Sequence, residues 1–279
     1  MTSPESFLSS LVADLEQNRF ELPTLPEVAL RVRDAVENGK TNARQTADLI
    51  ATDAALSARL IQVVNSPLYR ASKPIDSLPM AVSRLGNALV RNLVTSLVMK
   101  QMFQATTDFL DRRLRALWEH NVQVAAIARV LAARVPGLSP DQAMLAGLLH
   151  DVGALPILTR AEDDPRLLGD MITLDRLVAE HHPRIGAHIL TSWGFPPSLV
   201  AVAAEHEDLQ RDPDGPPDLV DVVLVANLQS YLGGTHPHSQ VDWSTVPAFR
   251  RLGIDTDVSV VEITEGSEEI EEVQRLLEA

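Results

Sequence analysis

The segment Met144–Leu155 constrains the fold more than any other stretch of the chain. It is an apolar run that leads into an adjacent histidine and aspartate, His150 and Asp151, with Gly153 two residues later. A neutral imidazole beside a carboxylate offers good ligands for a divalent cation. The alternative is a histidine at a helix end that its neighbouring aspartate holds in place by hydrogen bonds. The pair by itself leaves both interpretations open.

The residues before this segment predict where its helix begins. Ser139 can cap a helix, Pro140 suits the first helical position, and Gln142 completes the spacing of a capping box. We therefore expect His150 and Asp151 near the C-terminal end of a largely buried helix.

Three further histidines and one asparagine lie on or beside the apolar stripes of other predicted helices. His120 lies on the stripe of an alanine- and valine-rich helix, and His206 falls on the inward side of a later one. Pro183 suits a first helical turn, so we expect a helix to begin there with His182 near its N-cap. Asn227 lies on an apolar helix face, where a buried amide needs hydrogen-bond partners. Each histidine, taken alone, is also explained as a core residue with satisfied hydrogen bonds.

Apolar residues recur at helical spacing along the chain, and no stretch alternates as a strand does, so the predicted fold class is all-α. An amphipathic helix is predicted at 4–17, and the first hundred residues predict a compact helical bundle. Within it, Asp53 is placed to cap a helix, while Asn65 and Ser66 precede a proline and suit a helix end. The alternative for these three residues is a surface patch that contacts a partner.

The composition excludes several kinds of site. The chain has no cysteine, so a disulfide, a thiolate metal site and a cysteine nucleophile are all impossible. No stretch approaches eighteen uninterrupted apolar residues, so we expect no membrane span and a cytoplasmic protein. The net charge of −14 opposes binding to a nucleic acid backbone. A local basic patch at Arg112, Arg113 and Arg115 is conceivable, although arginines at this spacing usually form a solvated helix face.

Several short motifs occur in the order known from one protein family. They are Leu22-Pro23-x-Leu25-Pro26, Thr52-Asp53-x-Ala55-Leu56-x-Ala58-Arg59-Leu60, Asn65-Ser66, Ala81-x-x-x-Leu85-Gly86, Trp118-x-His120, Gly147-Leu148-Leu149-His150-Asp151-x-Gly153 and His182-x-x-x-Gly186-Ala187. Over roughly residues 15–235 the chain resembles the HDOD family, whose members are similar to the metal-dependent phosphohydrolases of the HD superfamily, including the HD-GYP cyclic-di-GMP phosphodiesterases.

The resemblance implies an all-helical fold with an N-terminal bundle over 1–110, an HD-like helical domain over 111–235, and an acidic C-terminal helical extension over 236–279. HDOD proteins are generally regarded as regulatory modules of bacterial signalling whose hydrolase site has decayed. By position, the hydrolase ligand pattern falls on His120, His150, Asp151, His182, His206 and Asn227.

Three departures from the hydrolase pattern bear on activity. Asn227 stands where the hydrolases carry a closing aspartate, and Glu205-His206 stands where the HD-GYP group has paired histidines. The lysine that usually follows the His-Asp-x-Gly step is Ala154, and there is no Gly-Tyr-Pro signature. A neutral amide weakens metal binding and leaves one group fewer to orient a bound water. Losing the lysine removes a charge that would stabilise a phosphoryl transition state.

These observations predict a regulatory HDOD module that binds a signalling protein or a small nucleotide ligand and does not hydrolyse it. We expect no cofactor; the alternative is a residual divalent ion (iron, manganese, zinc or magnesium) held by the five histidine and aspartate positions, with Asn227 at most a weak oxygen donor. The competing function is a metal-dependent phosphodiesterase acting on a nucleotide or cyclic dinucleotide. Binding to nucleic acid or to a membrane is not expected, and the oligomeric state is left open.

Overall fold

The computed structural model describes residues 23–39, 41–69, 74–104, 107–162, 169–256 and 266–278, together with Ala13 and Leu167. Apart from Ala13, the helix predicted at 4–17 lies outside this set. Every regular element among the described residues is a helix, which confirms the predicted all-α class. The α-helices are α2 (Glu27–Glu37), α3 (Ala43–Ile50), α4 (Ala54–Val64), α5 (Leu78–Leu85), α6 (Asn87–Met99), α7 (Asp108–Ala133), α8 (Pro140–Leu149), α9 (Ala154–Ala161), α11 (Met171–Ser192), α12 (Pro197–Glu205), α13 (Leu219–Ser230), α14 (Pro247–Leu252) and α16 (Ser267–Glu278). Short 3₁₀ helices are η1 (Lys100–Phe103), η2 (Pro237–Gln240) and η3 (Trp243–Thr245).

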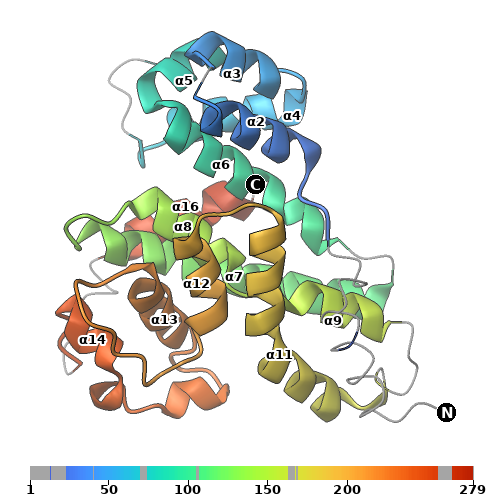
Figure 1. Ribbon diagram of the computed structural model, residues 1–279, viewed down its shortest axis with the longest axis vertical. Helices are drawn as coiled ribbons and strands as arrows, with labels where there is room; N and C mark the ends of the chain where they lie inside the picture. Colours follow the sequence, from blue (N-terminus) through green and yellow to red (C-terminus); the bar gives the residue numbers. More distant parts are fainter. Residues whose placement is uncertain are drawn as a thin grey trace.

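Helices α2 to α5 form a bundle at one end of the molecule, and α6 runs from this bundle toward the other half (Figure 1). Side-chain caps begin two of these helices. The Asn42 side chain and Gln45 form a complete capping box at α3. At α4 the Asp53 carboxylate accepts a hydrogen bond of 2.9 Å from the Leu56 amide, which confirms the predicted capping role of Asp53.

Asn65 ends α4 and also holds the chain that enters α5. Its side-chain amide donates to the Ile75 carbonyl (2.7 Å) and its side-chain oxygen accepts from the Ile75 amide (2.8 Å). Ser66 is buried beside it. Asn65 therefore has the structural role predicted for a helix end, because it connects two segments of the bundle.

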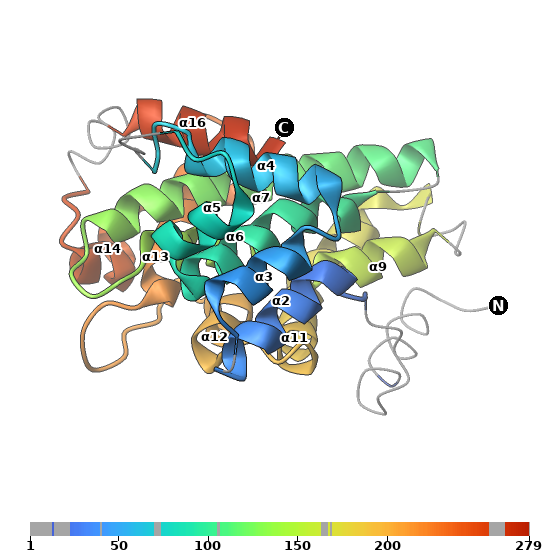
Figure 2. The same cartoon turned by 90° about the horizontal axis from the view of Figure 1, so that it is seen from above.

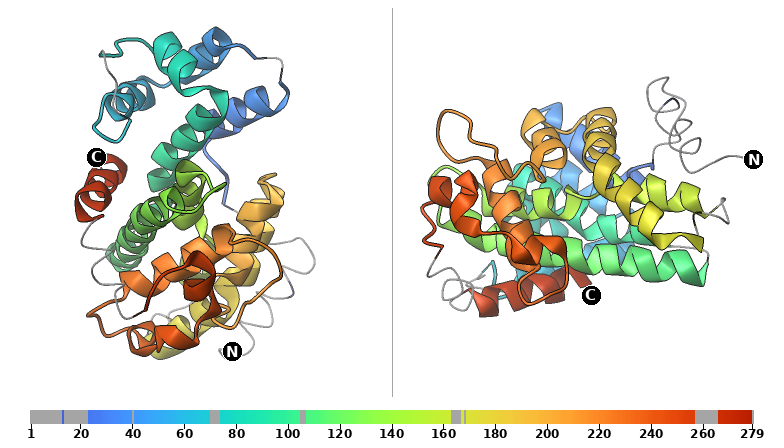
Figure 3. Two further views of the ribbon diagram at one scale, coloured as in Figure 1. Left: turned by 90° about the vertical axis from the view of Figure 1, so that its left-hand side faces the viewer. Right: turned by 90° about the horizontal axis from the view of Figure 1, so that it is seen from below.

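The two ends of the molecule pack against each other along α6, α8 and α16. Figure 2 shows α16 lying beside α4 and α7, and Figure 3 shows the same junction from two further sides. The Arg59 guanidinium of α4 donates to the carbonyls of Leu276 and Leu277 in α16 (3.3 and 3.4 Å). The Tyr69 hydroxyl donates to Asp141 of α8 (2.6 Å). One continuous set of buried apolar side chains runs through both ends.

Among the described residues, only the stretch Pro140–Ala161 is long and apolar enough to cross a membrane. It comprises α8, α9 and the turn between them, and 83% of its most apolar window is buried inside the protein. Its apolar character therefore serves the core of the fold.

The predicted helix start at Pro183 is wrong. A single helix, α11, runs from Met171 to Ser192 with Pro183 inside it. A proline there removes one backbone hydrogen bond. The helix continues because side chains on both sides of the proline, such as Leu177 and Ile185, are fully buried in the core. His182 thus lies in the middle of a helix and not at an N-cap.

Candidate metal centre

Two glycines let the helices that carry the candidate residues approach one another. A Cβ added at Gly147 of α8 would lie 2.6 Å from the Ala125 Cα of α7, so only glycine allows these backbones to touch. A Cβ added at Gly153 would lie 2.0 Å from the His182 carbonyl oxygen of α11. The contact at Gly147 packs α8 against α7, and the contact at Gly153 packs the turn after α8 against α11. His150 and Asp151 lie between the two contacts.

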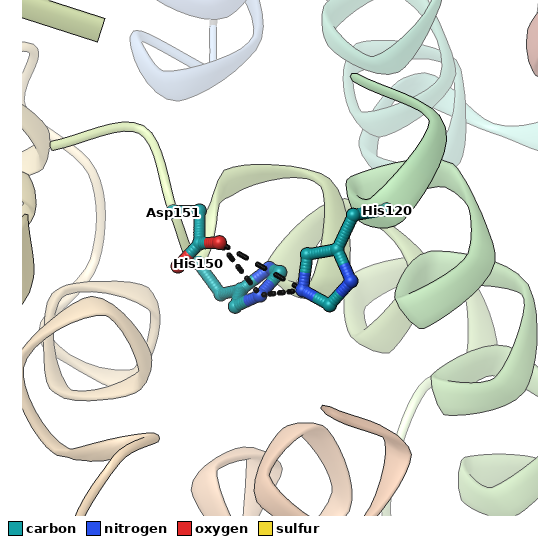
Figure 4. Close-up of side chains that lie close together, drawn as sticks. All are labelled: His120, His150 and Asp151. Atoms are coloured by element: carbon teal, nitrogen blue, oxygen red, sulfur yellow. Dashed lines mark hydrogen bonds and ion pairs between the residues drawn. The ribbon is translucent and has the colours of Figure 1, made fainter. Parts of the chain in front are cut away.

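The first group of side chains consists of His120 from α7 with His150 and Asp151 from the end of α8 (Figure 4). The Nε2 atoms of His120 and His150 are 3.3 Å apart. Asp151 Oδ2 lies 3.7 Å from the first of these atoms and 3.5 Å from the second. His150 is fully buried, whereas His120 and Asp151 are about 15% exposed, so this side of the group faces a pocket.

The second group lies on the other oxygen of the same carboxylate. Asp151 Oδ1 is 3.1 Å from His182 Nε2 of α11 and 3.3 Å from His206 Nε2 at the end of α12. The two Nε2 atoms are 3.1 Å apart. The structure therefore brings together all five predicted histidine and aspartate positions, as two three-residue groups that share Asp151.

Backbone carbonyls orient three of the four histidines. In each of His150, His182 and His206, Nδ1 lies within hydrogen-bond distance of a carbonyl three or four residues earlier in the chain. The carbonyls belong to Gly147, Val178 and Val202, at 2.7, 2.8 and 3.0 Å respectively. Because a carbonyl oxygen only accepts, we assign the proton of each neutral ring to Nδ1. Each Nε2 then directs a lone pair at Asp151 and its neighbours, as metal-bound histidines do.

His120 is held from α13 and from the residue after it. The Ser230 hydroxyl donates to the Asn227 carbonyl (2.7 Å), so its oxygen is left to accept from His120 Nδ1 (3.5 Å). The Tyr231 hydroxyl lies 3.3 Å from His120 Nε2 and is the donor of that contact. His120 therefore has the same tautomer as the other three histidines.

Burial and mutual charge set the protonation of the cluster without a metal. Burial lowers the pKa of His150 to about 3. Burial also opposes charge on His182, but the adjoining Asp151 carboxylate outweighs it and raises the His182 pKa. Although burial disfavours its charge, the surrounding imidazoles lower the pKa of Asp151 well below its usual range. In the metal-free protein the Asp151 carboxylate thus favours the protonated form of His182.

Sequence reasoning selected the wrong glutamate. Glu205, which with His206 stands where the HD-GYP group has paired histidines, was predicted beside the candidate site, but its carboxylate pairs with Arg211 (2.7 Å). Glu207 is the carboxylate at the cluster: its Oε1 accepts from Asn227 Nδ2 (3.1 Å) and lies 3.7 Å from His206 Nε2. Its position directly after His206 was the available signal. Glu205 was selected instead because Glu205-His206 stands where the resemblance to the HD-GYP group places paired histidines.

Three aromatic rings next to the cluster were also missed. Tyr231 stacks between His120 and His236, with ring centroids 4.9 and 3.8 Å away. His238 approaches the same tyrosine edge-on and lies 3.3 Å from Glu207. His120, Asp151, Tyr231 and His236 line a pocket of about 520 Å³, whose other lining residues are Arg112, Arg113, Ala116, Leu117, Ala154, Leu158 and Val178.

The donor set fits a divalent metal. Neutral imidazoles and carboxylates suit zinc, iron and manganese, and both groups offer three such donors within 4.8 Å of one another. A further observation is Asn227, which is 2% exposed. Its Nδ2 is committed to Glu207, so its orientation is fixed, and its Oδ1 makes no well-formed hydrogen bond. A nearby cation or a water would satisfy a buried acceptor oxygen of this kind.

The fold and the site together define an HD-like helical protein. The defining features are a His-Asp pair at the end of a buried helix and histidines that converge on it from three other helices. The chain matches the HDOD domain family over residues 22–209, and it belongs to this family.

Two solved structures share the fold along nearly the whole chain. A candidate metal-dependent phosphohydrolase from Shewanella amazonensis SB2B has a TM-score of 0.85 at 29% identity, covering 98% of this chain and 99% of that one. An HDOD domain protein of unknown function from Geobacter sulfurreducens has a TM-score of 0.68 at 26% identity, with the same coverage. Both agree with a helical HD-like architecture.

The chain spans half or less of the curated relatives that it matches. An uncharacterized protein of Treponema pallidum (strain Nichols) is 26% identical over 258 residues, which are 87% of this chain and 48% of that protein. Ribonuclease Y of Thermus thermophilus is 32% identical over 108 residues, which are 39% of this chain and 15% of the ribonuclease. The likeness to the ribonuclease therefore covers a small part of that enzyme.

Proposed function

We propose that this protein is a regulatory HDOD module that binds a divalent metal ion at the Asp151 cluster and a small phosphate-bearing ligand in the adjoining pocket. The observation that carries the proposal is the arrangement of lone pairs. Four histidine Nε2 atoms face one carboxylate. The Nε2 atoms of His182 and His206 are 3.1 Å apart, and the neutral form of each ring carries its proton on Nδ1, so no hydrogen lies between the two Nε2 atoms. A cation placed among these atoms would stabilise the arrangement.

The residues that would hold an ion form two groups that share Asp151, namely His120 with His150 and His182 with His206. Asn227 Oδ1 and Glu207 lie at the edge of the set. Donors of this kind favour manganese, iron or zinc over magnesium, which prefers oxygen ligands and keeps several waters. A bound ion would supply positive charge at the floor of the pocket and attract the oxygens of a phosphate group.

Hydrolysis is not expected, for two reasons that concern this chain's own residues. Asn227 offers a neutral carbonyl oxygen where a carboxylate would orient and activate a water, and its amide group is committed to Glu207. Ala154 lines the pocket at the position where the hydrolases carry a lysine. The chain therefore lacks, at that position, the positive charge that would stabilise a phosphoryl transition state. The pocket is therefore suited to retaining a ligand, as a sensing module requires.

The second candidate function is a metal-dependent phosphohydrolase, and Glu207 is the observation that favours it. This carboxylate lies 3.7 Å from His206 Nε2, close enough to replace the missing aspartate as the group that accepts a proton from water. The name of the Shewanella neighbour points the same way.

The experiment that separates the two functions combines activity with reversion. Wild-type protein is assayed with Mn²⁺ or Fe²⁺ on mononucleotides and cyclic dinucleotides, and Asn227→Asp is assayed in parallel. We expect ligand binding without turnover in the wild type, and measurable turnover only in Asn227→Asp. Wild-type turnover that disappears in His150→Ala would overturn the regulatory function and support the hydrolase.

As a regulatory module, the protein would pass its state to a signalling partner, and the cytoplasm is the compartment we propose for it. Nucleic acid is an unsuitable ligand because the net charge of −14 repels an extended phosphate backbone, whereas one or two phosphates reach the metal centre individually.

A further inference from the structure

Tyr231 has a role that the metal ligands alone do not explain. Its ring is held between His120 and His236, which fixes its plane, and its hydroxyl lies 3.3 Å from His120 Nε2. That nitrogen is also the atom that His120 would offer to a metal ion. The hydroxyl and the metal therefore compete for one lone pair.

The competition has a consequence for the hydroxyl. When the lone pair of His120 binds an ion, the Tyr231 O–H loses its acceptor. It is then a half-buried donor at the edge of the metal centre, and a buried donor without a partner is costly. A ligand in the pocket can supply the missing acceptor, because Tyr231 lines the pocket together with His120 and Asp151.

The rest of the pocket indicates what kind of ligand supplies that acceptor. Arg112 and Arg113 lie on its wall one helical turn before Ala116 and Leu117. They bring positive charge to the pocket, although the protein as a whole is acidic. Arg113 also pairs with Asp175. A phosphate oxygen accepts a hydrogen bond from a tyrosine hydroxyl, and a phosphate group suits both the ion and the guanidinium groups.

We propose that Tyr231 couples metal loading to anion binding: it donates to His120 in the metal-free protein and to a phosphate oxygen of the ligand once the metal is bound. This inference rests on the proposed metal-binding function and adds a residue and a ligand class to it. Tyr231 is a binding residue in this scheme, and the order of events is metal first and anion second.

The test is the substitution Tyr231→Phe, which keeps the ring stack and removes only the hydroxyl. Its matched control is Tyr69→Phe, because the chain has only two tyrosines and Tyr69 bonds Asp141 far from the cluster. Calorimetry measures Mn²⁺ binding to each metal-free protein, and then inorganic phosphate binding to each Mn²⁺-loaded protein. Circular dichroism checks that both variants keep the wild-type helix content.

In Tyr231→Phe we expect Mn²⁺ to bind as tightly as in the wild type or up to about fivefold more tightly, because its competitor is gone. Phosphate should bind about tenfold or more weakly, because a charge-assisted hydrogen bond is lost. Tyr69→Phe should match the wild type in both measurements. A variant in which Tyr231 were merely structural would lose affinity for both ligands.

The outcomes separate this inference from the proposed function. If the wild type binds Mn²⁺ but Tyr231→Phe binds phosphate as tightly as the wild type does, the role of Tyr231 is wrong and the metal site stands. If Tyr231→Phe loses Mn²⁺ affinity, the competition is wrong. If the wild type binds no Mn²⁺, both the proposed function and the inference fail.

Discussion

Replacing Gly153 by alanine tests how the fold assembles the metal centre. Gly153 has a φ of −68°, which alanine adopts without strain, so the substitution acts only through the volume of the added methyl group. That methyl would lie 2.0 Å from the His182 carbonyl oxygen and 2.4 Å from the Gly186 amide nitrogen. Both atoms belong to the backbone of α11 and cannot turn aside as a flexible side chain would.

The size of the effect follows from these distances. Ordinary contacts begin at 3.4 Å, so the turn and α11 must separate by about 1.4 Å. Overpacking costs about 1–3 kcal/mol, and a backbone contact belongs at the upper end of that range. Alanine recovers about 0.4–1 kcal/mol by restricting the unfolded chain. We therefore expect the free energy of unfolding to fall by about 2 kcal/mol.

The same separation acts on the metal centre. Asp151 precedes Gly153 by two residues and lies 3.1 Å from His182 across the same contact. Metal–ligand distances tolerate only about 0.2 Å, so Mn²⁺ affinity should fall at least tenfold. Urea unfolding and calorimetry measure the two effects. Gly169→Ala is the matched control, since nothing lies within 4 Å of its added methyl. If Gly153→Ala and Gly169→Ala behave alike, the proposed packing of the turn is refuted.

Three further predictions concern stability. Asp53→Ala should lower the free energy of unfolding by about 1 kcal/mol through loss of the α4 cap, measured by urea unfolding; an unchanged stability with lost signalling would favour a partner-contacting patch. In the metal-free protein the pKa of His150 is near 6.5 when the chain is unfolded and about 3 when it is folded. The unfolded state therefore binds more protons between these values, so the free energy of unfolding should fall as the pH drops below 6.5, by about 1.4 kcal/mol per pH unit for this group. Urea unfolding with a chelator at pH 7 and pH 5 checks this, and His150→Gln losing as much as the wild type would contradict it. A fragment of residues 1–110 lacks α8 and α16, which cover its apolar side, so it should be poorly soluble; a cooperative, monomeric fragment would argue against this packing.

The helices could be predicted from the sequence because they depend on local patterns. The convergence of the cluster was predicted from histidines on inward-facing helix stripes together with the ligand pattern that the HDOD resemblance implies. The capping residues Ser139 and Asp53 act within one turn of the chain, and their hydrogen bonds are those that the spacing predicts. The capping box at α8 was only half right, because Gln142 donates to Ser198 of another helix instead of closing the box. The hydrogen-bond partner of Gln142 is set by the packing of α8 against α12, which a local sequence pattern does not predict.

The errors share the same cause. Pro183 is a strong local signal for a helix start, but burial on both sides of it keeps α11 continuous. Glu207 follows the last turn of α12, where the chain leaves helical geometry, so a helical period does not show which way its side chain points. The helical period over 219–232 does place Tyr231 on the face of Asn227, but it does not show that the ring contacts His120 and His236. The pocket wall, which combines α7, α9 and α11 with the segment after α13, likewise depends on packing between segments distant in sequence.

The most direct test of the central claim is the anomalous scattering of manganese in a crystal of the purified protein grown with Mn²⁺. We predict an anomalous peak beside the Asp151 carboxylate with histidine nitrogens among its ligands, and no such peak in crystals of Asp151→Asn grown in the same solution. The substitution preserves the shape of the side chain and removes the charge that both three-residue groups share. A well-ordered wild-type crystal without a peak at Asp151, or an equal peak in Asp151→Asn, would contradict the assignment of this cluster as a metal centre.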